Sequence, residues 1–155
     1  MQADIRFKKL STTKQEKLQG FRVDALKLVR PGDSFGYRIS RGSVTLVYAS
    51  DASYNNPTPR HMKKYYEFFK DADTLIFDAH FGLIESFEKS DWGHSTPFIG
   101  VDIAVNAGVK RLVLFHHDHL SDDNRLSELF ERTKSYLDHV SSGRTLRSHP
   151  RSRWP

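Results

Sequence analysis

The sequence predicts an α/β protein with a mixed sheet, first an antiparallel meander and then strands that alternate with helices packed on the sheet. Two observations favour this class. Residues 21–50 contain three strand-like segments joined by short turns, as an antiparallel meander requires. From residue 43 onward the order is strand, helix, strand, helix, strand, helix, which is typical of parallel strands covered by helices.

The meander is expected to begin at residue 21. Residues 21–28 alternate apolar and polar side chains with the period of a half-buried strand, and residues 35–40 follow after a Pro-Gly-Asp turn. Residues 43–51 are rich in β-branched and aromatic side chains and end on Asp51, so they predict a central strand. Residues 1–19 lack periodicity and predict a loop or, at residues 5–7, a short edge strand.

Helices and buried strands follow. Thr58-Pro59 and Thr96-Pro97 each offer an N-cap before a first-turn proline, which predicts helices from residue 59 to about 71 and from residue 97 to Gly108. A last helix is expected to start at residues 121–123. Residues 74–78 and 111–115 are short apolar runs, typical of strands buried on both faces. Residues 79–95 form a long loop, a feature that is often functional.

Composition narrows the chemistry. The 155 residues include no cysteine, so a metal site would need His, Asp or Glu ligands. No segment resembles a signal peptide or a membrane span, which predicts a cytoplasmic protein without membrane contact. Four arginines fall in residues 144–155, which contain no acid, and they account for most of the net charge of +5. Residues 141–155 therefore predict a disordered basic tail, which can also attract nucleic acid.

Polar residues stand at the ends of successive strands. Asp51, Asp78 and His116 each close an expected strand, and His94 lies in the loop beside the second. Parallel strands bring their carboxyl ends to one edge of a sheet, so we expect these four side chains to meet. Oxygen and nitrogen ligands of this kind suit a zinc or other hard metal ion. The alternative is that these polar residues only face water.

The local motifs resemble, in order, the C-terminal half of the metallo-β-lactamase fold, and most of all its ribonuclease Z and phosphodiesterase-like branch. The resemblance covers residues 20–140, which we take as one half-domain of an αββα sandwich, and it rests on six landmarks. These are Phe35-Gly36-Tyr37-Arg38-Ile39, Val47-Tyr48-Ala49-Ser50-Asp51, Phe77-Asp78-Ala79, Gly93-His94-Ser95-Thr96, residues 104–109 and Leu112-Val113-Leu114-Phe115-His116.

This resemblance implies roles for the four residues. Asp51 matches an aspartate that bridges two metal ions, zinc or manganese, and His116 matches a terminal metal ligand. His94 matches a catalytic histidine near the scissile phosphate, and Asp78 an acid that orients it. The implied reaction is two-metal hydrolysis of a phosphodiester or of another ester or amide.

The departures from the family pattern matter as well. The main metal motif, His-x-His-x-Asp-His, is absent, and Arg30 stands where another metal histidine is expected. A guanidinium has no lone pair for a metal, so Asp51 and His116 alone are expected to bind metal weakly. We therefore expect a truncated hydrolase that is inactive alone. Alternatively, the chain is a non-enzymatic half-domain that pairs with itself or with a separate N-terminal half; the weakest alternative is nucleic-acid binding through the tail.

The sequence contains two further groups of histidines. His116-His117-Asp118-His119 fits the last four positions of the main motif, with Leu114 where its first histidine should stand, and so could form a displaced metal cluster. Otherwise His117, Asp118 and His119 are expected to be exposed loop residues. His61, His80 and His139 show no partner pattern and predict ordinary surface or hydrogen-bonded histidines.

Overall fold

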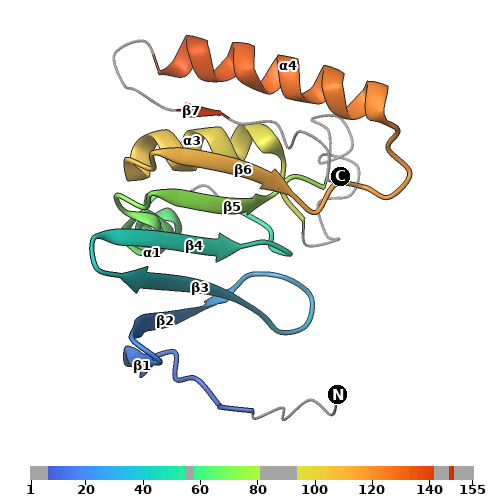
Figure 1. Cartoon of the computed structure of the whole chain (residues 1–155). Helices are drawn as coiled ribbons and strands as arrows, with labels where there is room; N and C mark the ends of the chain where they lie inside the picture. Colours follow the sequence, from blue (N-terminus) through green and yellow to red (C-terminus); the bar gives the residue numbers. More distant parts are fainter. Residues whose placement is uncertain (1–6, 55–57, 81–93, 142–146, 149–155) are drawn as a thin grey trace, which may run out of the picture.

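A mixed β-sheet with helices on one face forms the body of the protein (Figure 1). The computed structural model describes residues 7–54, 58–80, 94–141 and 147–148. Within these residues the sheet has seven strands in the order β1-β2-β3-β4-β5-β6-β7. The strands are β1 (Glu16–Leu18), β2 (Phe21–Leu28), β3 (Ser34–Arg41), β4 (Val44–Ala49), β5 (Thr74–Asp78), β6 (Arg111–Phe115) and β7 (Arg147–Ser148). The helices are α1 (Pro59–Phe69), α3 (Pro97–Ala107) and α4 (Asp123–Val140).

The predicted meander is confirmed. β2 pairs antiparallel with β3 and β3 with β4, so that Tyr37 stands opposite Tyr48. Gly42 turns the chain between β3 and β4 with a φ of 58°, a left-handed conformation that glycine adopts without strain. β1, which pairs with β2, lies where the sequence predicts loop, because three residues are too few to show an alternating pattern. Of the edge strand expected at residues 5–7, only Phe7 is described, and it is not in a strand.

The second half of the sheet is parallel, as the alternation of strands and helices predicts. β4 pairs with β5 and β5 with β6 in parallel register. β7 adds two further parallel pairs to β6, in a tail for which the sequence predicts disorder. A strand of two residues has no detectable periodicity, so its pairing depends on the edge that β6 offers. Residues 142–146 and 149–155 of that tail lie outside the described residues.

The helix starts follow their capping residues. Thr96 accepts a hydrogen bond from the backbone N–H of Ile99 at 3.3 Å, and α3 ends at Gly108 in the left-handed conformation. Asp122 caps α4 by accepting from the N–H of Arg125 at 2.8 Å. Thr58 precedes the proline that opens α1 but makes no side-chain cap bond. α1 ends at Phe69, two residues before the predicted end.

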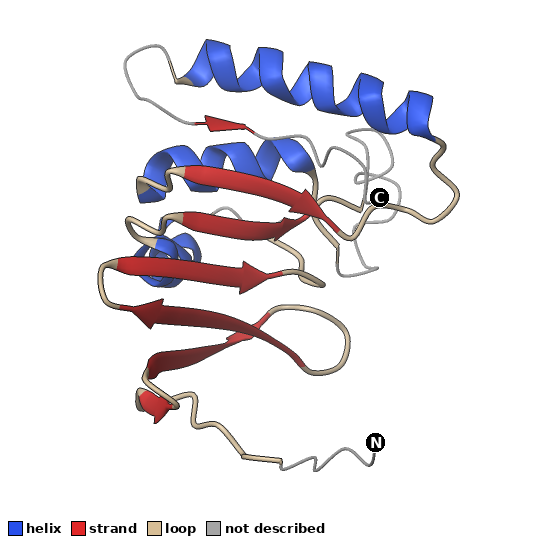
Figure 2. Ribbon diagram, in the orientation of Figure 1, coloured by secondary structure: helices blue, strands red, loops and turns tan. Residues whose placement is uncertain are grey.

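The core lies between the sheet and helices α1 and α3 (Figure 2). Its largest fully buried side chains include Phe69 of α1, Leu75 and Phe77 of β5, and Ile103 of α3. α4 lies beside α3, where the hydroxyl of Tyr136 donates to a carboxylate oxygen of Asp102 at 2.8 Å. Within the described part of the chain, no helix combines the length and hydropathy needed to cross a membrane.

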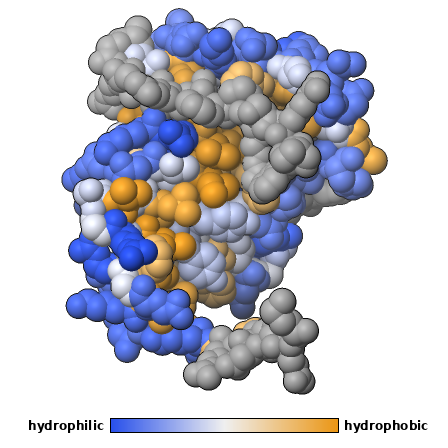
Figure 3. Space-filling model, viewed as in Figure 1, coloured by the Kyte–Doolittle hydropathy of each residue, from blue (hydrophilic) through white to orange (hydrophobic). Residues whose placement is uncertain are grey.

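The opposite face of the sheet carries apolar side chains that are only half-buried. Cross-strand pairing brings them to one side of β3, β4, β5 and β6, and none of the described helices lies over them (Figure 1). Figure 3 shows hydrophobic residues gathered in the middle of this face. We call this surface the open sheet face; its residues are Tyr37, Ile39, Leu46, Tyr48, Ile76 and Val113.

Candidate metal centre

The carboxyl ends of β4, β5 and β6 bring the four predicted site residues together. Asp51 follows β4, Asp78 ends β5, His116 follows β6, and His94 precedes the N-cap of α3. Each of the four offers one potential ligand atom, and these atoms all lie within 4.8 Å of one another. The predicted meeting of Asp51, Asp78, His94 and His116 at one sheet edge is what the structure contains.

Two of these residues have left-handed backbones. Asp51 has a φ of 60° and His116 a φ of 59°. Such conformations cost a residue with a β-carbon about 1–3 kcal/mol and concentrate at functional sites. Here they turn each chain sharply at its strand end, which points both side chains toward the end of β5.

Asp78 is the fixed point of the site. It is fully buried. One carboxylate oxygen accepts from the N–H groups of Asp51 at 2.8 Å and Ala52 at 3.3 Å, and the other accepts from those of His80 at 3.1 Å and Ser95 at 3.3 Å. The carboxylate therefore ties the segment after β4, the segment after β5 and the approach to α3 to one point.

The two predicted histidines face this carboxylate. Nδ1 of His94 lies 3.1 Å and Nδ1 of His116 lies 3.3 Å from the same oxygen of Asp78. The corresponding distances to Asp51 are 3.7 and 3.8 Å. The side chain of His94 is 11% exposed and that of His116 is 36% exposed, so the site opens to solvent on the side of His116.

Arg30 forms an ion pair with Asp51. Its guanidinium is part-buried, and its Nε is buried without a hydrogen-bond partner among the described residues. The permanent positive charge of Arg30 is therefore paired with the carboxylate of Asp51, the residue that the family resemblance identifies as a metal-bridging ligand.

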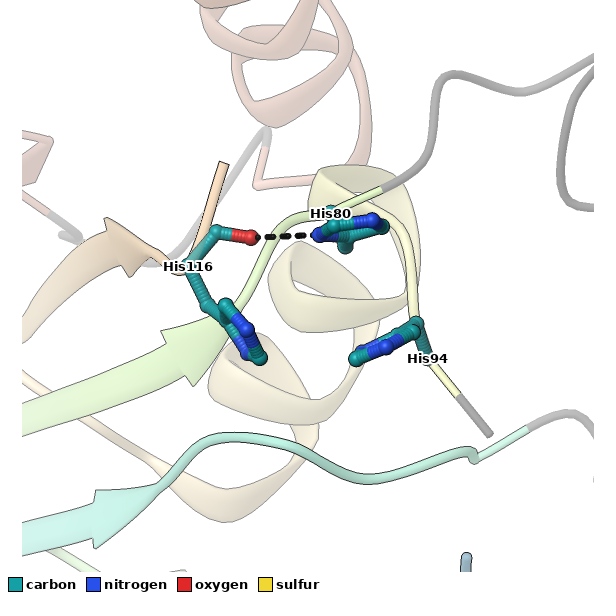
Figure 4. A group of neighbouring side chains, drawn as sticks. All are labelled: His80, His94 and His116. Carbon is teal, nitrogen blue, oxygen red and sulfur yellow. Dashed lines mark hydrogen bonds between the residues drawn. The ribbon is translucent and has the colours of Figure 1, made fainter. Parts of the chain in front are cut away.

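His80 is a site residue that the sequence prediction missed. Its ring stacks on that of His94 with centroids 4.3 Å apart and lies 5.3 Å from the ring of His116 (Figure 4). Burial, and then the neighbouring His94, hold the pKa of His80 below its usual value. Its place two residues after Asp78, at the same strand end, was the available signal.

His117 also departs from the prediction, because it is half-buried rather than exposed. Burial lowers its pKa. His119, in contrast, is 86% exposed, as predicted, while the Asp118 side chain is only 13% exposed and accepts from the N–H of Leu120 at 2.9 Å. Among the described residues, no group of potential metal ligands contains His117, Asp118 or His119, so the geometry does not support a displaced metal motif.

The chemistry of these donors fits a metal ion. Two carboxylates and three imidazoles converge at the edge of the sheet, and this mixture of oxygen and nitrogen ligands suits zinc or manganese. Several polar atoms of residues that contact the site or neighbour it in sequence are buried without a hydrogen-bond partner among the described residues. They are Arg30 Nε, Ser50 Oγ, Ser95 Oγ and His117 Nδ1.

Similar proteins carry the same fold. Residues 6–117 match the family model of the beta-lactamase superfamily domain. The chain is 31% identical over 106 residues to the probable metallo-hydrolase YhfI of Bacillus subtilis. This match covers 68% of this chain and 40% of YhfI. It is 30% identical over 112 residues to ribonuclease Z of Sulfurisphaera tokodaii, covering 69% of this chain and 34% of the relative. The chain thus spans less than half the length of these curated relatives.

Solved structures agree with the sequence matches. The crystal structure of YhfI from Bacillus subtilis superposes with a TM-score of 0.67 at 23% identity, over 90% of this chain and 51% of that one. The short form of human tRNase Z superposes with a TM-score of 0.59 at 25% identity, over 67% of this chain and 38% of the other. This chain therefore belongs to the beta-lactamase superfamily domain family, with the metallo-β-lactamase fold and a likeness to ribonuclease Z.

Proposed function

We propose that the sheet-edge site is one side of a metal-dependent hydrolytic centre for a phosphodiester, or for another ester or amide. The observation that carries this proposal is the convergence of Asp51, Asp78, His94 and His116 within 4.8 Å. The family, whose curated members include metallo-hydrolases and ribonuclease Z, supports the reaction class. Two further observations support the proposal. The pKa of His80 is lowered, and Asp51 and His116 have left-handed backbones; both features concentrate at functional sites.

In this proposal Asp51 and His116 are metal ligands. Both project from strand ends that β-sheet pairing holds in register, so the distance between them is set by the sheet and not by a free loop. Two metal ions bound here would lower the pKa of a water molecule and stabilise charge on the reacting phosphate. In this proposal the ions are zinc or manganese, which oxygen and nitrogen donors suit.

His94 and Asp78 form the acid side of the proposed site. Asp78 lies 3.1 Å from Nδ1 of His94, which orients the ring. In this proposal the other nitrogen of His94 donates a proton to a leaving oxygen or stabilises negative charge on it. Because the Asp78 carboxylate is held by backbone N–H groups, it can position the histidine without moving itself.

Arg30 limits what the chain can do alone. Its ion pair with Asp51 competes with any metal for that carboxylate, and the sequence contains no His-x-His-x-Asp-His motif. We propose that the chain binds two metals weakly and is inactive by itself, and that a polypeptide carrying the missing motif completes the centre.

Hydrolysis of bis(p-nitrophenyl) phosphate with added zinc or manganese tests this proposal. The chain alone should show no turnover above that of the Asp51→Ala and His116→Ala variants. Mixed with a half-domain that carries the missing motif, it should gain turnover that Asp51→Ala, His116→Ala and His94→Ala each abolish. Turnover by the chain alone that is lost in the first two variants would refute the inactivity, and a stable complex without turnover would refute the hydrolytic role.

A second candidate function is that of a non-enzymatic half-domain that pairs with a second copy or with a separate N-terminal half. The open sheet face motivates it, because soluble monomers rarely leave a large apolar surface uncovered. Sedimentation equilibrium over a range of concentrations tests self-pairing. Ile76→Lys, on the open sheet face, should weaken association, whereas Glu131→Lys, on the exposed side of α4, should not. A monomer at all concentrations would exclude pairing of the chain with itself.

A further inference from the structure

The edge of the sheet at β1 carries an excess of positive charge. Residues 7–22 contain five basic residues and one acidic residue, Glu16, which gives this segment a net charge of +4. Residues 23–143, in contrast, contain 14 basic and 17 acidic residues and have a net charge of −3. We call the five basic residues, all of them exposed, the basic edge; they are Lys8, Lys9, Lys14, Lys17 and Arg22.

Two members of the basic edge face each other across β1 and β2. Lys17 stands directly opposite Arg22, so both side chains point to the same face of the sheet. Like charges in such a pair repel and destabilise the strand pairing, and neither side chain forms an ion pair within the described part of the chain. A bound anion would remove this repulsion.

Positive charge also lies on the other face of β1. Glu16 points to that face, because successive residues of a strand alternate between the two faces. Its carboxylate lies 3.4 Å from Nζ of Lys8 and 3.3 Å from Nζ of Lys14. Lys14 first, and then Lys8, hold the pKa of Glu16 below its usual value. One carboxylate balances only one of the two ammonium groups, so a net positive charge remains on this face as well.

Two exposed phenylalanines belong to the same segment. Phe7 directly precedes Lys8 and is 95% exposed. Phe21 directly precedes Arg22 and is 36% exposed, with the guanidinium of Arg41 5.2 Å from the centre of its ring. Proteins that bind single-stranded nucleic acid combine basic side chains, which contact the phosphates, with aromatic rings on which the bases stack.

We propose that the basic edge binds single-stranded nucleic acid, with its lysines and Arg22 on the phosphates and Phe7 stacked on a base. A single strand can bend so that its phosphates reach both sides of β1, whereas a flat membrane surface would contact one side. The surface is separate from the candidate metal centre, because β1 lies at one end of the sheet and the centre at the carboxyl ends of β4, β5 and β6 (Figure 1). It therefore stands whether or not the chain takes part in hydrolysis.

Fluorescence anisotropy of a labelled single-stranded RNA of about 15 nucleotides, titrated with the full chain, tests the basic edge. With a net charge of +4 engaged, the slope of log affinity against log salt should be about −2.8, so that raising the salt from about 50 to about 200 mM weakens binding roughly 50-fold.

The double variant Lys9→Gln/Lys17→Gln should halve the salt slope and bind at least about tenfold more weakly at low salt, because two phosphate contacts are lost. The matched control is Lys63→Gln/Lys134→Gln. It removes the same charge from exposed positions of α1 and α4 and should bind as the wild type does.

Phe7→Ala tests the stacking contact. Its affinity should fall about fivefold or more while the salt slope stays unchanged, because a stacked base is lost and no phosphate contact is. Leu120→Ala, which removes another exposed apolar side chain, 76% exposed in the loop before α4, is the control and should have no effect.

Four outcomes would overturn the proposal. Equal weakening by both lysine double variants would show that binding follows total charge and not its position. Wild-type affinity in Lys9→Gln/Lys17→Gln together with loss in Arg151→Gln/Arg153→Gln would place the nucleic acid on the tail. Stronger binding to phosphatidylserine vesicles than to the RNA would indicate a membrane surface, and an unaffected Phe7→Ala would indicate a general polyanion site. None of these outcomes changes the result expected for hydrolysis at the metal centre.

Discussion

Asp78 illustrates at the residue scale how a single buried charge can organise a site. Its side chain is 0% exposed and accepts hydrogen bonds from four backbone N–H groups, those of Asp51, Ala52, His80 and Ser95. A buried carboxylate is tolerated only when hydrogen bonds replace water. These bonds hold the segments that carry the histidines, so Asp78 is a positioning residue whatever the bound species is.

Replacing Asp78 by asparagine should therefore destabilise the fold. An amide can accept at only one of its two ends, so some backbone N–H groups would face an NH₂ group and lose their acceptor. We expect the free energy of unfolding to fall by about 1–3 kcal/mol, measured by urea denaturation. Asp138→Asn, on the exposed side of α4, is the control. An unchanged unfolding midpoint for Asp78→Asn would contradict this account of the residue.

Arg30 gives the second residue-scale prediction. Arg30→His removes the positive charge paired with Asp51 and supplies a neutral imidazole in its place. Zinc affinity should rise at least about tenfold, roughly 1.4 kcal/mol, as measured by calorimetry. Arg30→Gln removes the charge without adding a good ligand and should recover only part of the gain. Equal affinity in wild type and Arg30→His would show that Arg30 does not compete with a metal.

Some of the residues at the site could be predicted from the sequence, and others could not. Asp51, Asp78 and His116 could be predicted because parallel strands must bring their ends together, and His94 through its Gly-His-Ser-Thr motif. His80 and His117 follow the same strand ends, but the pattern does not show which of two successive side chains turns inward. That choice depends on loop geometry and on the hydrogen bonds from Asp51, Ala52 and Ser95 to Asp78, which join residues distant in sequence.

At the scale of elements, the close contact between α3 and β5 fixes the site relative to the core. Gly100 of α3 lies over the buried ring of Phe77, and an added β-carbon would stand 2.7 Å from Phe77 Cδ1. Glycine is a poor helix former, so its presence in α3 reflects this contact. The helix could not otherwise approach the strand that carries Asp78 so closely.

Gly100→Ala should accordingly be destabilising. Overpacking of a rigid core costs about 1–3 kcal/mol, which outweighs the gain of about 1 kcal/mol from better helix propensity. Urea denaturation should show a net loss of about 1–2 kcal/mol. Adding Phe77→Leu should recover part of that loss relative to Phe77→Leu alone, because the smaller side chain makes room. Strictly additive effects of the two changes would contradict the contact.

Tyr54 connects the segment after β4 with α1 and β5. It is buried, donates its hydroxyl hydrogen to the carbonyl of Ala49 at 3.3 Å and lies against the rings of Tyr65 and Phe77. Burial, chiefly, raises its pKa well above 10.0. The folded state thus holds the Tyr54 proton more tightly than the unfolded state does.

This difference predicts alkaline sensitivity. The stabilising contribution of Tyr54 is fully present below the unfolded pKa of 10.0 and is lost as pH rises above that value toward the folded pKa. Urea denaturation from pH 8 to pH 11 should show a steeper loss of stability for wild type than for Tyr54→Phe. At pH 8 the variant should be weaker by about 0.5–1.5 kcal/mol because it lacks the hydrogen bond. Parallel pH profiles would contradict the raised pKa.

The long elements were predictable and the short ones were not. β2 to β6 and helices α1, α3 and α4 each span enough residues to display an apolar period or a cap. β1 and β7 have three and two residues, and each exists because a neighbouring strand presents unpaired backbone groups. Such short strands form only where the rest of the sheet offers a partner, and their residues are too few to show an alternation of apolar and polar side chains.

At the scale of the whole molecule, the sheet separates two surfaces with different chemistry. One face is filled by α1 and α3, while the open sheet face keeps half-buried tyrosine and aliphatic side chains. The ionisable cluster lies at the edge between them, where the parallel strands end. Fold class and strand order could be predicted because strand and helix alternate in the sequence, whereas the exposure of one sheet face could be recognised only after the strands were paired.

The candidate metal centre requires that this edge of the sheet binds a metal ion. Anomalous diffraction at the zinc absorption edge, from crystals of the chain grown or soaked with zinc, tests it most directly because it locates the ion. We expect a peak within bonding distance of Asp51 and His116, beside His94 and Asp78. A peak only at exposed His119 or His139, or no peak with zinc present in excess, would contradict it.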